Sequence, residues 1–146
     1  MEEIVKLIDE NMRYEKHEIK NEILYIYVKS SREEVNCPNC GYASNNVHSR
    51  YSRHFRELPV QDMKVEIILS NRILFCKNKE CSRTKFAETF GCLPYKAKRS
   101  KRLTAKIMEI SLEMSSITAS EILRNGIADV SKSTICNLYK KRNASN

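Results

Sequence analysis

The chain has 146 residues, a formal net charge of +8, and 41% hydrophobic against 30% charged residues. This length holds one domain or two small ones and excludes a large core. The basic balance favours a polyanionic partner, most often nucleic acid, although an excess of lysine can also serve solubility alone. No apolar run approaches the ~20 residues of a membrane-spanning helix. The acidic, amphipathic start is unlike a secretory signal, so we expect a cytoplasmic protein.

The charge is distributed unevenly along the chain. Residues 1–36 carry six basic and nine acidic side chains, residues 37–98 carry eleven and five, and residues 99–146 carry nine and four. The excess of basic charge is therefore confined to the last two thirds. A surface that binds a polyanion should lie there.

The predicted elements begin with a short helix over residues 2–12, with Ile4, Leu7 and Ile8 on one face. Residues 17–30 are rich in Ile, Tyr and Val, a composition that predicts a strand.

The middle third predicts a hairpin. A strand is expected over residues 50–58, a turn over 58–63, and a second strand over 64–76. The second strand shows the period-two alternation of a half-buried strand, in Val65, Ile67, Leu69, Ile73 and Phe75.

Four of the six cysteines form two pairs that flank this hairpin. Pro38 stiffens the first pair, and Gly41 after it permits the positive φ that such turns often need. Structural zinc prefers four tetrahedral ligands, thiolates above all, and cytoplasmic thiols stay reduced. The spacing therefore predicts a zinc ribbon with one structural zinc ion. The predicted ligands are Cys37, Cys40, Cys76 and Cys81.

The alternative is that these are ordinary buried thiols. Cys92 could compete as a ligand but has no partner at knuckle spacing, and Cys136 lies in a helical pattern. His48 and His54 could also bind metal, although each fits a polar position on a strand. Four thiolates close the metal's open position, and no catalytic motif accompanies them. We therefore expect no catalytic residue and no enzyme.

The last third predicts three helices after a basic linker over residues 94–102. The first helix has one apolar face, which comprises Leu103, Ile107, Ile110 and Met114.

In the second helix, Thr118 is expected as the N-cap, and Glu121 completes a capping box. Ile122 and Leu123 are expected on the buried side, and Gly126 is expected to end the helix in the left-handed conformation.

In the third helix, Ser131 fits the N-cap, and Val130 and Ile135 occupy the positions of a hydrophobic staple. Two short helices joined by a glycine-containing turn and supported by a first helix describe a helix-turn-helix. A plain three-helix bundle with a solvated basic face is the alternative.

In a helix-turn-helix the third helix would enter the major groove, with its N-terminal residues nearest the bases and its last basic residues on phosphates. The predicted DNA-binding residues are Arg99, Lys101, Arg102, Thr118, Ser131, Lys132, Ser133, Thr134, Asn137, Lys140, Lys141 and Arg142.

The central segment resembles the N-terminal zinc-finger region of bacterial insertion-sequence transposases of the ISL-three family. The shared pattern is C-P-x-C-G at Cys37–Gly41, V-H-S-R-Y-x-R at Val47–Arg53, L-P at Leu58–Pro59, Cys76, Cys81, and R-x-x-F at Arg83–Phe86.

The resemblance implies zinc held by the four paired cysteines and binding to the terminal inverted repeats of the element. Members of the family continue into an RNase-H-like catalytic domain, which we expect to be absent from this chain. A small zinc-dependent DNA-binding regulator or repressor, or a zinc-ribbon module for protein interaction, remains as an alternative.

Together these observations predict an α+β protein, with a small zinc-ribbon-like antiparallel β domain followed by a three-helix helix-turn-helix domain. The expected divisions are residues 1–36 packing on the ribbon, a ribbon over 37–95, a linker over 96–102 and the helices over 103–146. The expected partner is double-stranded DNA, with a homodimer or a full-length transposase as further partners, and no membrane or small-molecule substrate.

Overall fold

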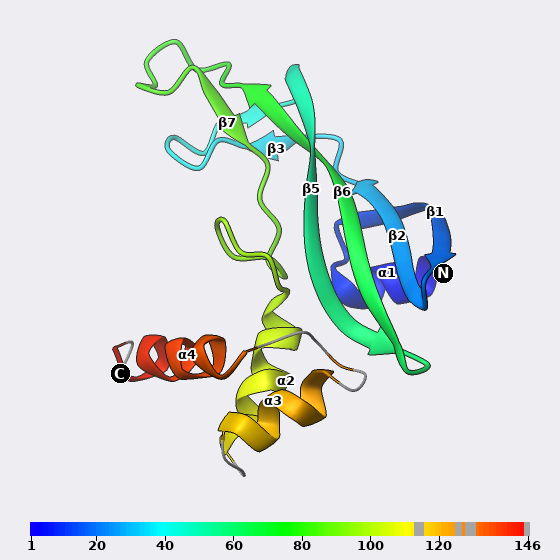
Figure 1. The fold of residues 1–146 in the computed structure, drawn as a ribbon. Helices are drawn as coiled ribbons and strands as arrows, with labels where there is room; N and C mark the ends of the chain where they lie inside the picture. Colours follow the sequence, from blue (N-terminus) through cyan, green and yellow to red (C-terminus); the bar gives the residue numbers. More distant parts are fainter. Residues whose placement is uncertain (113–115, 125–126, 128–130, 145–146) are drawn as a thin grey trace.

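A computed structural model describes residues 1–112, 116–124, 127 and 131–144, and it has a mixed α+β architecture (Figure 1). Within these ranges no helix is both long and apolar enough to cross a membrane. The elements in chain order are α1 (Glu2–Ile8), β1 (Met12–Lys20), β2 (Ile23–Ser30), β3 (Val35–Asn36), β4 (Ala43–Ser44), β5 (Val47–Val60), β6 (Met63–Phe75), β7 (Lys85–Ala87), α2 (Lys101–Leu112), α3 (Ser116–Arg124) and α4 (Lys132–Ala144).

The main sheet has the strand order β1-β2-β6-β5, with β7 paired to the end of β6. The pairs β1–β2, β5–β6 and β6–β7 are antiparallel, as expected of a ribbon, and β3 and β4 form a separate small antiparallel pair. However, β2 pairs with β6 in parallel, so the sheet is mixed and not purely antiparallel. The strands of the first third are therefore part of the same sheet as the predicted central hairpin.

Two tight turns of the same kind shape this sheet. Gln61 and Asp62, both at positive φ, join β5 to β6 inside the predicted turn region. Asn21 and Glu22, also at positive φ, join β1 to β2. Paired positive φ values are those of a type I′ hairpin turn, whose twist matches that of the strands. The prediction of a single strand over residues 17–30 was therefore wrong, because the chain reverses within it.

The core lies on one face of the sheet, beneath α1. The alternation predicted for β6 is confirmed at Val65, Ile67 and Leu69, which are at most 1% exposed, but it is wrong for Ile73 and Phe75, because Leu74 is the buried residue there and Phe75 is 38% exposed. These side chains pack with buried residues of β2 and β5 and with α1 in a single cluster that includes Leu24, Ile26, Val28, Phe55, Val5 and Ile8.

Helix α1 is shorter than predicted, and of its three expected core residues Ile8 is buried and Ile4 packs against the core, but Leu7 does not. It ends at Ile8 instead of continuing to residue 12. Leu7, expected in the core, is 74% exposed, whereas Val5 is fully buried. The backbone N–H of Asp9 closes the last turn on the Val5 carbonyl, and Asp9 itself is extended, so the chain leaves the helix there and enters β1.

The last three helices share a core of their own. Leu103 and Ile107 of α2, Ala119 and Leu123 of α3, and Ile135 of α4 are all buried in one cluster. Ile110 packs against this cluster, as its predicted place on the apolar face of α2 required, whereas Met114 lies outside the described residues.

The predicted ends of these helices were only partly right. Thr118 lies inside α3, which begins at Ser116, so Thr118 is not its N-cap. Ile122, expected on the buried side, is 42% exposed. The N-cap of α4 is confirmed, because the N–H of Thr134 donates to Ser131 Oγ at 3.1 Å. The predicted stop at Gly126 and the staple at Val130 lie outside the described residues.

Hydrogen bonds of Arg56 and Glu57 in β5 with Lys98 and Ser100 attach α2 to the sheet, and we call this contact the joint at Glu57. The Arg56 N–H donates to the Lys98 carbonyl and the Ser100 N–H to the Arg56 carbonyl, each at 2.9 Å. Ser100 Oγ donates to buried Glu57 at 2.8 Å and accepts the Leu103 N–H at 3.1 Å, so Ser100 caps α2. Leu58 of β5 packs against the helical core. The segment predicted as a linker therefore contains main-chain hydrogen bonds to the sheet.

We predict that Ile67→Ala lowers the free energy of unfolding by about 2–5 kcal/mol, because it opens a cavity in the middle of the main core. Urea denaturation followed by circular dichroism measures the loss. Leu7→Ala removes a comparable aliphatic side chain from an exposed site and should change stability by no more than about 0.5 kcal/mol. Equal losses in the two variants would contradict the assignment of the core.

Candidate metal centre and basic helices

The first knuckle lies between β3 and β4. The Cys37 N–H donates to the Tyr42 carbonyl at 2.9 Å, and the Gly41 N–H returns to the Cys37 carbonyl at 2.8 Å. Gly41 has φ +77, a conformation that costs glycine little and strains other residues. The turn predicted from Gly41 is therefore confirmed. It brings both sulfurs of the pair to the same side of the loop.

The second knuckle lies between β6 and β7. The Cys76 N–H donates to the Thr84 carbonyl at 2.9 Å, so the loop closes just beyond the paired strands. Inside it, the Cys81 N–H donates to the Asn78 carbonyl at 3.1 Å, and the Asn78 side chain accepts the Glu80 N–H at 3.0 Å. The Asn78 side chain thus supports the longer spacing of this pair with a local turn.

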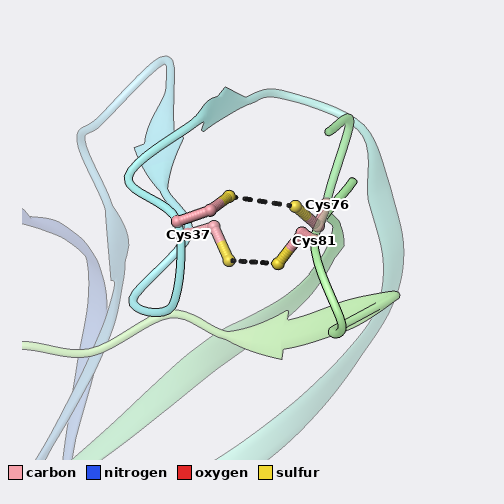
Figure 2. Close-up of side chains that lie close together, drawn as sticks. Cys37, Cys76 and Cys81 are labelled. Atoms are coloured by element: carbon pink, nitrogen blue, oxygen red, sulfur yellow. Dashed lines mark hydrogen bonds between the residues drawn. The ribbon is translucent and has the colours of Figure 1, made fainter. Parts of the chain in front are cut away.

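The sulfur atoms of the two knuckles point toward one another (Figure 2). Cys37 Sγ lies 4.0 Å from Cys81 Sγ, and Cys40 Sγ lies 3.6 Å from Cys76 Sγ. All four sulfurs lie within 4.8 Å of one another. A tetrahedral zinc with Zn–S bonds of about 2.3 Å requires sulfurs roughly 3.8 Å apart, whereas a disulfide requires about 2.05 Å. The four cysteines therefore fit one structural zinc ion.

The hydrogen bonds around the sulfurs favour thiolates at two of the four positions. The Cys40 N–H lowers the pKa of Cys37. The Asn39 side-chain amide, 3.3 Å from Cys81 Sγ, and the Arg83 N–H at 3.4 Å lower the pKa of Cys81 to about 7. Asn39 was not predicted to act at the metal site. Its position between Cys37 and Cys40 is the sequence feature from which this contact with a sulfur could have been predicted.

Ionisation of Cys76 requires a nearby cation. The Asn78 N–H favours ionisation of Cys76, but desolvation and the neighbouring thiols outweigh it and raise the pKa of Cys76 to about 12. Four thiolates within such short distances repel one another, and a bound divalent ion offsets that repulsion. This donor set therefore suits a closed zinc site with no vacant position for catalysis.

The other candidate ligands lie elsewhere. Cys92 and Cys136 do not belong to the cluster, and burial together with Asp9 raises the pKa of Cys92 to about 12. His48 bonds Ser49 Oγ at 2.9 Å and stacks edge-on against Phe75. His54 Nδ1 lies 3.8 Å from Glu66. Within the described residues, the cluster thus consists of the two predicted cysteine pairs and includes none of these other side chains.

The knuckles and the hairpin strands between them identify this part of the chain. Residues 33–81 match the family model for the zinc-finger of transposase IS204/IS1001/IS1096/IS1165. This segment is therefore similar to the zinc finger of that transposase family. Comparisons with curated proteins and with solved structures gave no match. The transposase family match covers the zinc finger alone and leaves helices α2 to α4 outside it.

The structure places the residues predicted to bind DNA in two groups. The first surrounds the start of α2: Lys101 is exposed, Arg99 is half-buried, and Arg102 Nε lies 3.6 Å from the buried Glu57 carboxylate. Arg102 is therefore tied to the joint with β5. Thr118 is exposed on α3.

The second group lies on α4. Ser131, Lys132, Ser133, Asn137 and Lys140 are exposed, and Thr134 is half-buried with its hydroxyl 3.1 Å from Ser131 Oγ. Lys141 and Arg142 belong to the same helix, and their side chains lie outside the described part of the structure.

We predict that Cys40→Ser removes most of the zinc from the purified chain, because three thiolates no longer close the tetrahedron. Cys92→Ser is the matched control, since Cys92 lies outside the cluster, and it should retain about one zinc per chain. Elemental analysis of both variants after dialysis measures the difference. A zinc-loaded Cys40→Ser chain would contradict the assignment of the ligands.

Chelation should unfold the knuckles without unfolding the sheet. Among the described residues, the cluster at the metal site is small and consists of Val35, Leu74 and Phe86 with the ligand Cys37, whereas the main core is separate and larger. We expect hydrogen exchange on chelation to rise in residues 35–46 and 76–87 and to stay slow in β2 and in β6 up to Leu69. Uniform loss of protection would show that the sheet also depends on zinc.

Proposed function

We propose that this chain is the DNA-binding N-terminal region of an insertion-sequence transposase and that it recognises the terminal inverted repeats of the element. The match of its zinc ribbon to the zinc finger of a transposase family carries the proposal. The basic helices joined to that ribbon support it, because terminal repeats are duplex DNA and a polyanion needs a cationic surface.

Helix α4 fits the role of a recognition helix. Ile135 is fully buried and Leu138 packs on the helical core, so these residues hold α4 against α2 and α3. On the exposed side, Ser133, Asn137 and Lys140 follow one another at a spacing of four and three, which places them on one face. A helix-turn-helix formed by α3 and α4 would present this face to the major groove.

The chemistry of this face matches the two kinds of DNA contact. Asn137 can donate to and accept from an adenine edge, which would give sequence preference. Lys140 on this face, and Lys132 at the first position of α4, can neutralise phosphates, which would give affinity without sequence preference. A zinc ribbon and a helical unit held together by the joint at Glu57 would then act on one continuous DNA site.

The test uses the full, zinc-loaded chain and a duplex selected from a random library. Lys140→Ala should weaken binding to all duplexes alike and reduce the slope of log K against log salt by about 1. Asn137→Ala should lose about 1–3 kcal/mol of discrimination at a single base pair. Fluorescence anisotropy across a salt series measures both effects.

Lys6→Ala is the control for charge alone, because Lys6 lies on α1, far from α4 in the fold (Figure 1). It should leave the salt slope unchanged. Absence of salt-dependent DNA binding by the unmodified chain would overturn the proposed function and favour a module for protein interaction. Equal losses on selected and random duplexes would remove Asn137 from sequence readout.

A further inference from the structure

A second basic surface is formed by residues that were not among the predicted DNA-binding residues. Between β5 and the segment before α2 there is a groove lined by Ser52, Arg53, His54, Phe55, Arg56, Glu66, Lys96, Ala97 and Lys98. Four of these side chains are permanently cationic and one is a carboxylate. The groove therefore carries a net positive charge even with a neutral histidine.

The segment on one side of this groove is held in place by β5. Arg53 Nη2 donates to the Pro94 carbonyl at 2.9 Å and to the Ala97 carbonyl at 3.4 Å. The main-chain bond from Arg56 N–H to the Lys98 carbonyl fastens its other end. Residues 94–98 are thus supported at both ends, and the groove is a built feature of the fold.

The two lysines of the groove are available to an anion. Lys96 and Lys98 are both exposed, and in the described part of the chain neither forms an ion pair. Glu66, the carboxylate of the groove, lies beside Arg56 at 3.8 Å and His54 at 3.8 Å instead. An approaching phosphate would therefore meet Lys96 and Lys98 without first displacing a carboxylate.

An exposed aromatic residue adjoins these lysines. Tyr95 is 86% exposed, and Lys96 Nζ lies 5.4 Å from the centre of its ring. Together with Lys96 it lines a neighbouring hollow that also includes Tyr51 and Arg53. Tyrosine hydroxyls are common donors to DNA phosphates, so the basic groove continues into a surface of compatible chemistry.

The groove lies next to the helical unit. Lys98 is three residues before Lys101, the first residue of α2, and α2 shares its core with α4. In Figure 1 the loop between β7 and α2 projects to the same side of the sheet as α4. A duplex whose major groove holds α4 would have its flanking backbone on this side of the molecule.

We propose that this groove is a second contact for duplex DNA, in which Lys96 and Lys98 bind the phosphate backbone beside the site occupied by α4. The inference rests on the proposed function and extends the DNA-contacting surface from the helices to β5. The contact is made to phosphates and not to bases, so it adds affinity and fixes orientation without adding sequence preference.

The experiment compares two double variants that lose the same charge. Lys96→Ala with Lys98→Ala should reduce the slope of log K against log salt by about 2 on duplex DNA of random sequence. Lys16→Ala with Lys20→Ala removes two lysines from β1, at the opposite edge of the sheet from β5. This control should keep the slope of the unmodified chain.

Charge-retaining variants separate binding from structure. Lys96→Arg with Lys98→Arg should keep the full slope, because phosphates accept either cation. An unchanged slope in the alanine double variant, or an equal reduction in the β1 control, would overturn the groove assignment.

Failure of the groove and failure of the proposed function give different results. If Lys140→Ala reduces the salt slope while the groove variant does not, α4 binds DNA and only the groove assignment fails. If the unmodified zinc-loaded chain binds no duplex DNA, both proposals fail together.

Discussion

The antiparallel pairing of β5 with β6 is the interaction on which both ends of the molecule depend. The register runs from Val47 opposite Leu74 to Val60 opposite Met63. At one end it places Cys76 directly beyond β6, against the knuckle of Cys37 and Cys40. Toward the other end it presents Arg56, Glu57 and Leu58 to the helices. A slip of one residue would turn every side chain of a strand to the opposite face and would displace the metal site and the joint together.

The joint at Glu57 determines how the helices are presented. Glu57 is 2% exposed, accepts hydrogen bonds from Ser100 Oγ and from the Leu58 N–H, and faces Arg102. Its Oε2 is buried and has no hydrogen-bond partner among the described residues. A buried carboxylate is costly unless it is compensated, so the surrounding donors must stay in place. This requirement favours one fixed orientation of α2 on β5, and the groove of Lys96 and Lys98 lies beside the same joint.

The features that could be predicted from the sequence are those fixed by short stretches of chain. The knuckle of Cys37 and Cys40 follows from two residues and Gly41, and the alternation of β6 follows from its own side chains. Some errors concern a local turn that lacks the usual signal, and the others arose where distant parts of the chain decide. Asn21 and Glu22 form a turn without glycine, and the parallel pairing of β2 with β6 leaves no local signal.

Ile122 is apolar but faces outward because Leu123 and Ala119 fill the shared helical core. Lys96 and Lys98 were placed in a linker because their support comes from Arg53, more than forty residues earlier.

The zinc site and the basic surfaces are separated along the same sheet, and this separates their physical roles. The ion supplements a small core, because in the described part of the chain the cluster beneath the knuckles adds just Val35, Leu74 and Phe86 to the ligand Cys37. The groove and the helices rest on the main and helical cores, which contain none of the four ligands. The knuckles at the end of β5 therefore depend on zinc, while the positive charge of the groove and of α4 belongs to elements whose cores contain no zinc ligand. The hairpin of β5 and β6 thus connects the small cluster beneath the metal site with the main core and the helical core, so that one sheet carries both a metal-stabilised end and a cationic end.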